Sequence, residues 1–157
     1  MGRRDGIPTT IAEYPKRIIE GSPGTCRASA SCPERATLRY MDFEMLFAGT
    51  PVAEFDVSVD WYTALFGRAA DIPVTEDEVM WQFTDTSFLY VIRDPERAGR
   101  SVVTVSVPDL DAAVAEAAQR GIAGAPIVRV GTAGRKALYT DPDGNQVAII
   151  EVNQPTG

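Results

Sequence analysis

The stretch from Leu138 to Asn153, LYTDPDGNQVAIIEVN, reads as a strand, a tight turn and a second strand. The turn consists of Asp141, Pro142, Asp143 and Gly144. Proline presets φ, aspartate side chains bond nearby backbone N–H groups, and glycine tolerates positive φ. A calcium-binding loop needs more oxygen ligands in series than two aspartates provide. We therefore predict that the turn is a corner of a sheet and that the strands it joins carry the function.

The composition is that of one globular domain. The chain has 157 residues, of which 45% are hydrophobic and 24% charged. No apolar run approaches the ~20 residues that span a bilayer, and the N-terminal MGRRDGIPTT lacks the apolar segment of a secretory signal. We expect a cytoplasmic protein that does not enter a membrane.

The absence of histidine from the sequence excludes several kinds of site. Ser/His and Cys/His nucleophile pairs and a histidine general base are impossible. A zinc site has too few ligands, because Cys26 and Cys32 are the sole cysteines. A reducing compartment favours free thiols over a disulfide at these two positions. Asp, Glu, Tyr and Lys remain as acid–base candidates.

Charge and composition divide the chain near residue 42. Residues 1–42 hold seven basic and five acidic residues among repeated Pro, Gly and Ser, and we predict a flexible leader there. Residues 43–157, the predicted folded domain, hold 8 basic and 17 acidic residues, a net charge of −9. Such a surface repels nucleic acid and anionic membranes and attracts cationic small molecules, although solubility alone is a sufficient reason for it.

The domain repeats one order of elements twice. In the first half we predict a strand at 45–53, a helix at 56–66 that Gly67 ends, and strands near 70–74, 78–83 and 87–92. In the second half we predict a strand at 101–107, a helix at 110–120 that Asp109 caps and Gly121 ends, and strands near 126–130, 134–140 and 145–152. VAEFD at 52–56 matches VPDLD at 107–111, and FTD at 83–85 matches YTD at 139–141. We infer an internal duplication of a βαβββ unit.

Three segments resemble the vicinal oxygen chelate superfamily, which includes glyoxalase I, bleomycin-resistance proteins and extradiol dioxygenases. FDVSVDWYTALFG at 55–67 looks like its first helix, VPDLDAAVAEAAQRG at 107–121 like its second helix, and YTDPDGNQVAIIEV at 139–152 like its closing hairpin. The resemblance implies an α+β fold in which two βαβββ modules, at about 45–94 and 100–152, form a half-barrel cup. Members build the cup within one chain or from two subunits, and we expect a homodimer.

The alternation of side chains along each strand assigns one face to the cup. In the second module, Thr104, Gln146 and Ala148 face the cup, and pairing Thr140 with Asn145 across the turn adds Arg135 and Tyr139. Carrying this parity into the first module adds five aromatic residues, Phe47, Trp81, Phe83, Phe88 and Tyr90. A slip of one residue would invert any of these strands.

The resemblance also indicates where a metal would bind. Metal-dependent members use four positions that correspond here to Phe47, Val102, Ala148 and a residue near Tyr90. Phe, Val and Ala cannot ligate a divalent ion, and a neutral Tyr is a poor lone donor. Glu151 lies on the opposite parity, which favours a rim or helix-side carboxylate. We therefore expect neither a metal nor another cofactor.

The leading hypothesis is a metal-free protein that binds a planar or cationic small molecule in an apolar, aromatic cup. The predicted ligand-binding residues are Phe47, Trp81, Phe83, Phe88, Tyr90, Thr104, Arg135, Tyr139, Gln146 and Ala148. Alternation of aromatics on strands is also typical of a core, Arg135 also suits a solvated strand, and Tyr139 also suits a structural role. Two other functions stay open: a lyase, isomerase or dioxygenase of the same superfamily, and a scaffold whose basin another chain buries. No catalytic residue is identified.

Overall fold

The computed structural model describes residues 43–153. The first module comprises β1 (Leu46–Val52), α1 (Phe55–Phe66), β2 (Ile72–Thr75), β3 (Glu78–Thr84) and β4 (Ser87–Arg93). The second comprises β5 (Val102–Ser106), α2 (Leu110–Gln119), β6 (Val128–Val130), β7 (Gly134–Thr140) and β8 (Gln146–Val152). The predicted α+β fold of two βαβββ modules is confirmed. The leader predicted for residues 1–42, with both cysteines, lies outside the described residues.

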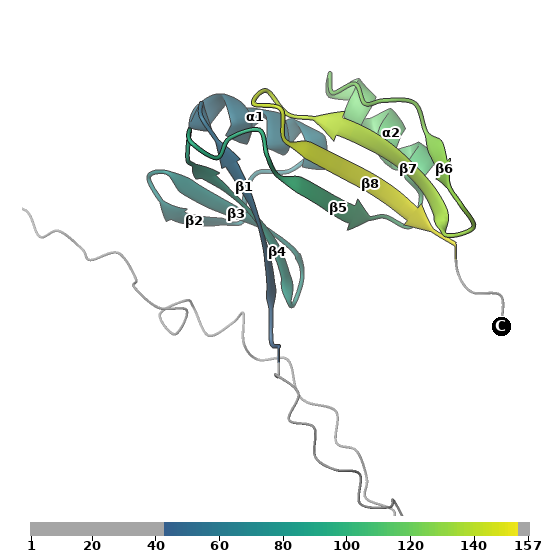
Figure 1. The fold of residues 1–157 in the computed structure, drawn as a ribbon, viewed down its shortest axis with the longest axis horizontal. Helices are drawn as coiled ribbons and strands as arrows, with labels where there is room; N and C mark the ends of the chain where they lie inside the picture. The colour runs from purple at the N-terminus through teal and green to yellow at the C-terminus, as the bar shows by residue number, and fades with distance from the viewer. Residues whose placement is uncertain (1–42, 154–157) are drawn as a thin grey trace, which may run out of the picture.

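Each module forms one four-stranded sheet with its helix on one face (Figure 1). Sheet A has the strand order β1-β4-β3-β2, and sheet B has the order β5-β8-β7-β6. The first strand of each module runs parallel to the last, whereas the other neighbours are antiparallel. Within the described residues, β1 and β5 therefore each have one unpaired edge. These two strands diverge from the corner where the modules meet (Figure 1).

The helix-facing sides of the two sheets share one hydrophobic core. Tyr62 and Leu65 of α1 and Leu110 and Ala117 of α2 are buried in it. The sheets contribute Val52, Trp81, Leu89, Val91, Ala137, Tyr139, Val147 and Ile149. Because the hydrophobic effect is the main force of folding, this shared core holds the two modules together.

The helix ends follow the signals in the sequence. The Asp109 side chain accepts a hydrogen bond of 2.9 Å from the Ala112 backbone N–H, so the predicted N-cap of α2 is confirmed. Gly67 follows α1 with a left-handed φ of 70°, and its N–H donates to the Thr63 carbonyl. Glycine adopts this conformation without the steric cost that other residues meet.

The hairpin registers differ from the prediction by one residue. Thr140 pairs with Gln146 and not with Asn145. Asn145 belongs to the turn, because its N–H donates to Asp141 Oδ1 and its side chain donates to the Pro51 carbonyl, each at 2.8 Å. In the first module, an irregularity between Gln82 and Thr84 shifts β3 in the same way. A one-residue shift turns every side chain of a strand to the other face.

The Asp141–Gly144 turn joins the second module to the start of the first helix. Asp143 accepts hydrogen bonds from the Ala53 N–H at 3.1 Å and from the Ser58 hydroxyl at 2.9 Å. Asp141, which is 4% exposed, accepts a hydrogen bond of 3.0 Å from the Tyr62 hydroxyl. The acidic side chains of the turn thus serve as hydrogen-bond acceptors that hold the modules together.

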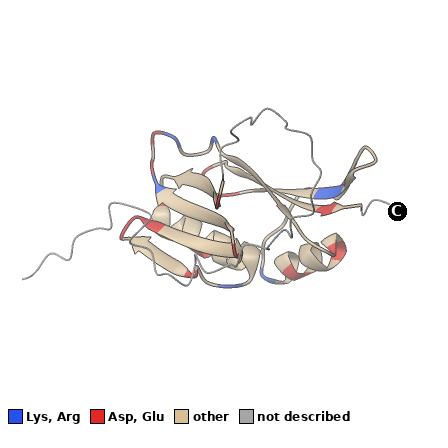
Figure 2. Ribbon diagram, turned by 90° about the horizontal axis from the view of Figure 1, so that it is seen from below, with Lys and Arg blue, Asp and Glu red and all other residues tan. Residues whose placement is uncertain are grey.

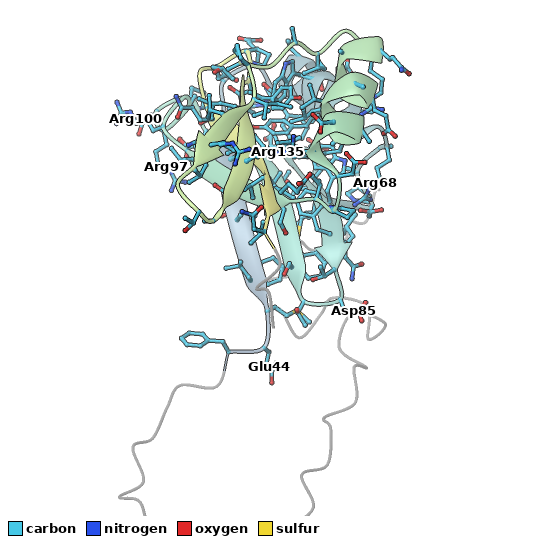
Figure 3. The ribbon with its side chains drawn as sticks, turned by 90° about the vertical axis from the view of Figure 1, so that its right-hand side faces the viewer. Glu44, Arg68, Asp85, Arg97, Arg100 and Arg135 are labelled. Carbon is cyan, nitrogen blue, oxygen red and sulfur yellow. The ribbon has the colours of Figure 1, made fainter. Side chains whose placement is uncertain are left out.

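One end of sheet A projects beyond the rest of the molecule. Figure 3 shows Glu44 at the foot of β1 and Asp85 at the tip of the β3–β4 hairpin. The two segments are joined where the Leu46 N–H donates to the Thr86 carbonyl at 2.8 Å. Neither helix in the described part of the chain is long and apolar enough to cross a membrane.

Candidate functional site

The face of sheet A opposite α1, here called the ring face, carries three of the predicted aromatic residues. Phe47 of β1 lies beside Phe88 of β4, and their rings stack with centroids 5.0 Å apart and an interplanar angle of 16°. Tyr90 follows Phe88 on the same face of β4, since Leu89 between them is buried in the core. The parallel register of β1 and β4 therefore brings Phe47, Phe88 and Tyr90 together.

Tyr90 lies over Gly49, its partner on β1. A Cβ atom on Gly49 would overlap the hydroxyl oxygen and ring carbons of Tyr90. The missing side chain thus makes room for the phenol, which extends across β1 toward the unpaired edge. Glycine inside a strand often marks such a close approach.

On the corresponding face of sheet B, β5 and β8 carry side chains smaller than the rings of sheet A. Thr104 of β5 pairs with Ala148 of β8, and Val102 pairs with Gln146. Val102 is 72% exposed, whereas Ala148 is 5% exposed. The structure thus places Thr104, Gln146 and Ala148 on the predicted face, where they form a flatter wall than the rings of sheet A.

Trp81 and Phe83 lie on the opposite side of sheet A from the prediction. Trp81 is fully buried beneath α1, and its Nε1–H donates to the Arg68 carbonyl at 3.0 Å. Phe83 meets the edge of the Phe66 ring of α1 at a centroid distance of 5.1 Å. The predicted parity of β3 was wrong, and both rings pack against the helix.

Arg135 and Tyr139 of β7 also lie on the opposite side of their sheet from the prediction. Tyr139 is 1% exposed, and its hydroxyl has no hydrogen-bond partner among the described residues. Burial raises the pKa of this phenol. Arg135 forms ion pairs of 2.9 Å with Asp111 and with Glu151. Both side chains therefore lie on the side of sheet B that faces α2.

Glu151 also lies on the helix side, as predicted from its parity. Its carboxylate accepts a hydrogen bond of 2.9 Å from the Leu110 N–H at the start of α2 and pairs with Arg135. A carboxylate at a helix N-terminus is favourable because the first N–H groups have no partner within the helix.

Sequence reasoning missed the residues of β3 and β7 that share the open faces. In β3 these are Glu78, Met80 and Gln82, which pair with Ile92, Tyr90 and Phe88. In β7 they are Lys136 and Leu138, which pair with Ile150 and Ala148. The pattern of β3 held a usable signal, because Val79, Trp81 and Phe83 form its uniformly apolar face.

The four positions that correspond to metal ligands lie on the open faces but do not fit a divalent ion. Phe47, Val102 and Ala148 have no lone pairs to donate, and Tyr90 supplies one phenol. Residues 43–153 contain no group of three or more His, Cys, Asp or Glu side chains that could hold a metal ion. Figure 2 shows mostly uncharged residues along the strands of both sheets.

A cleft of about 510 Å³ separates β1 with α1 from β5 with α2. Its apolar wall includes Leu46, Ala48, Phe66, Val103 and Val105. Arg68 and Arg120 also line the cleft. The Arg120 guanidinium caps the end of α1, because it donates to the carbonyls of Ala64 at 2.6 Å and Leu65 at 3.2 Å. Arg68 donates to the Gln82 carbonyl at 2.6 Å. The cleft therefore lies between the edges of β1 and β5 that are unpaired within the described residues. Both arginines that line it donate hydrogen bonds to backbone carbonyls.

Comparison with known proteins agrees with this architecture. Residues 46–149 match the model of the Glyoxalase/Bleomycin resistance protein/Dioxygenase superfamily. A glyoxalase/bleomycin resistance protein from Catenulispora acidiphila is 37% identical over 69% of this chain and 98% of its own, with a TM-score of 0.66. No curated protein matches the chain.

Two more distant structures share the fold. The bleomycin-binding protein of Streptomyces verticillus, complexed with copper(II)-bleomycin, is 21% identical over 73% of this chain and 100% of its own, with a TM-score of 0.60. An antibiotic-binding protein from a Streptomyces species is 20% identical over 76% of this chain and 100% of its own, with a TM-score of 0.57. From the family match and the Catenulispora structure, the chain belongs to the glyoxalase/bleomycin resistance protein/dioxygenase superfamily.

Proposed function

We propose that this protein binds a planar or cationic small molecule on the ring face without a metal ion and without transforming it. The partly exposed rings of Phe47 and Tyr90 carry the proposal, because they lie on the face of sheet A opposite α1. Phe88, which is 2% exposed, supports them by stacking on Phe47. Structures of the same fold include bleomycin-binding proteins in complex with bleomycin and with copper(II)-bleomycin, which supports a binding role.

The chemistry of the ring face suits a flat ligand. A stacking or cation–π contact contributes on the order of 1 kcal/mol. Two such contacts, from Phe47 and Tyr90, correspond to roughly thirtyfold in affinity. Tyr90 adds a hydroxyl that can donate to or accept from a polar group of the ligand.

The metal-free part of the proposal rests on donor chemistry. Phe47, Val102 and Ala148 leave Tyr90 as the one oxygen donor among the four mapped positions. Elemental analysis of the purified protein tests this point. A stoichiometric divalent ion would contradict it and would favour a metal-dependent lyase, isomerase or dioxygenase.

We also propose that a second copy of the chain completes the cup. The edges of β1 and β5 are unpaired within the described residues, and exposed strand edges invite pairing with another chain. Leu46 at the β1 edge is 65% exposed and Val102 at the β5 edge is 72% exposed. In such a homodimer, the ring face of one chain would meet the flat wall of the partner. A cytoplasmic location remains a prediction from the sequence.

Titration with pyrenemethylamine, a planar fluorescent cation, tests binding on the full chain. The signal should come from the probe, because Trp81 is buried under α1 and Trp61 lies on that helix. We expect Phe47→Ala and Tyr90→Ala each to weaken binding by about tenfold. Val57→Ala, at a 55% exposed position on α1, is the matched control. Unchanged affinity in both ring variants would overturn the proposal.

A further inference from the structure

Glu78 places one carboxylate on the ring face. It is the first residue of β3 and pairs with Ile92 on one side and Thr75 on the other. Met80 and Gln82, two and four residues further along β3, share its face. Within the described strands of sheet A, the registers place no other acidic side chain on this face.

The Glu78 carboxylate is half-buried, and no described residue forms an ion pair or hydrogen bond with it. The closest charged residues along the chain, Glu76 and Asp77, are exposed in the β2–β3 turn. Arg93 of β4 pairs with Asp77 at 2.8 Å and lies on the other parity of its strand. Lys136 occupies the open face of the other module.

An unpaired charge in this position is unfavourable for the folded protein. The carboxylate loses water without gaining a donor, and this loss raises the pKa of Glu78. Ionisable groups that are partly removed from water are frequent in functional sites, because binding and catalysis often need residues that lower the stability of the fold. The unpaired carboxylate on the ring face is therefore suited to pair with a bound cation.

We propose that Glu78 is the specificity-determining residue that makes the ring face select a cationic ligand. The proposal rests on the proposed function, since it names the chemical class that the same face binds. Tyr90 pairs with Met80, so Glu78 is a diagonal neighbour of Tyr90 across the strand pair. Diagonal strand positions lie about 7–8 Å apart, and the phenol extends away from β3 over Gly49 of β1. A ligand stacked on the phenol therefore needs a ring system broad enough to span β4 and bring its amine to Glu78.

A ligand cation at this position would give the carboxylate its missing partner. The attraction between the two charges is strengthened where the carboxylate is partly shielded from water. A neutral ligand of the same shape would leave Glu78 unpaired, and an anionic one would be repelled. The ring face therefore supplies affinity for flat molecules in general, while Glu78 supplies the preference among them.

Three pyrene probes of equal ring size and different charge test this assignment on the full chain. They are pyrenemethylamine, a cation, pyrenemethanol, which is neutral, and pyrenecarboxylate, an anion. We expect the cation to bind about tenfold more tightly than the neutral probe, with the anion weakest. Glu78→Gln, which keeps the shape of the side chain, should remove this preference and leave the neutral probe unaffected. Glu78→Lys should reverse the order.

The control is Glu76→Gln, which removes one negative charge from the adjacent exposed turn. It should leave the order of the three probes unchanged, because a solvated charge contributes little. If Glu78→Gln keeps the preference for the cation, the assignment of Glu78 is overturned. If the neutral probe binds in a way that depends on Tyr90 but charge has no effect, Glu78 fails while the proposed function stands. If none of the three probes binds, both fail.

Discussion

The hydroxyl of Tyr62 donates a hydrogen bond of 3.0 Å to Asp141 Oδ2 and thereby ties α1 of the first module to the closing turn of the second. The same carboxylate receives the N–H groups of Asp143 and Asn145. Burial, and after it the charge of Asp141, raises the pKa of Tyr62, so the phenol stays protonated and acts as a donor. The acidic turn thus binds a side chain 79 residues earlier in the chain.

Tyr62→Phe should lower the free energy of unfolding by about 1–2 kcal/mol, because a buried acceptor loses a donor. Tyr139→Phe is the matched control, since the Tyr139 hydroxyl is buried without a partner among residues 43–153. Its removal should be neutral or stabilising. Urea denaturation measures both. Equal destabilisation by the two substitutions would show that the Tyr62–Asp141 hydrogen bond contributes nothing.

Gly49→Ala should lower stability by about 1–3 kcal/mol, because the added Cβ overlaps the Tyr90 phenol and displaces it. The same variant should weaken ligand binding on the ring face. In a Tyr90→Ala background the cost of Gly49→Ala should largely disappear, and a double-mutant cycle by urea denaturation measures this coupling. Strictly additive effects would mean that the two residues act independently.

Glu78→Gln should stabilise the protein at neutral pH. The folded-state pKa of Glu78 is raised, so the folded chain binds this proton more tightly than the unfolded chain does. Stability contributed by the protonated group is present at low pH and is lost as pH rises through the folded pKa. The advantage of Glu78→Gln should therefore vanish below the ordinary pKa of a glutamate.

Parallel urea titrations of wild type and Glu78→Gln at neutral and acidic pH check this sign. Glu76, Asp77 and Arg93 lie close to Glu78 along the chain or across the strands and are the same in both proteins. The measured quantity is therefore the difference between the two curves. A glutamine variant that is less stable than wild type at neutral pH would contradict the desolvation of Glu78.

Leu46→Lys and Val102→Lys should each weaken the proposed homodimer by more than tenfold, because a lysine at an exposed edge opposes pairing with another chain. Val57→Lys, on the exposed surface of α1, should leave the dimer intact. Sedimentation velocity over a range of concentrations measures the association. A wild-type chain that stays monomeric at all concentrations would contradict the proposed homodimer.

Prediction from sequence succeeded where the signal was local. The order of the elements, the Asp109 cap and the parity of β1, β4, β5 and β8 are all confirmed, and they place Phe47, Phe88 and Tyr90 on one face. It failed for β7, where parity was carried across a turn, and for β3, where parity was carried from the second module into the first. Trp81 and Tyr139 consequently moved from the predicted cup into the core.

The sequence by itself determined that this protein is a duplicated βαβββ fold, because helix caps, turn residues and apolar periodicity act within a few residues of one another. The tertiary structure decided which side chains share an open face. Asn145 leaves the strand because its amide binds the Pro51 carbonyl of the other module, and that contact across the chain sets the register of the closing hairpin. The side-chain period of a strand is two, so this one displaced residue exchanges core and surface along the whole of β7.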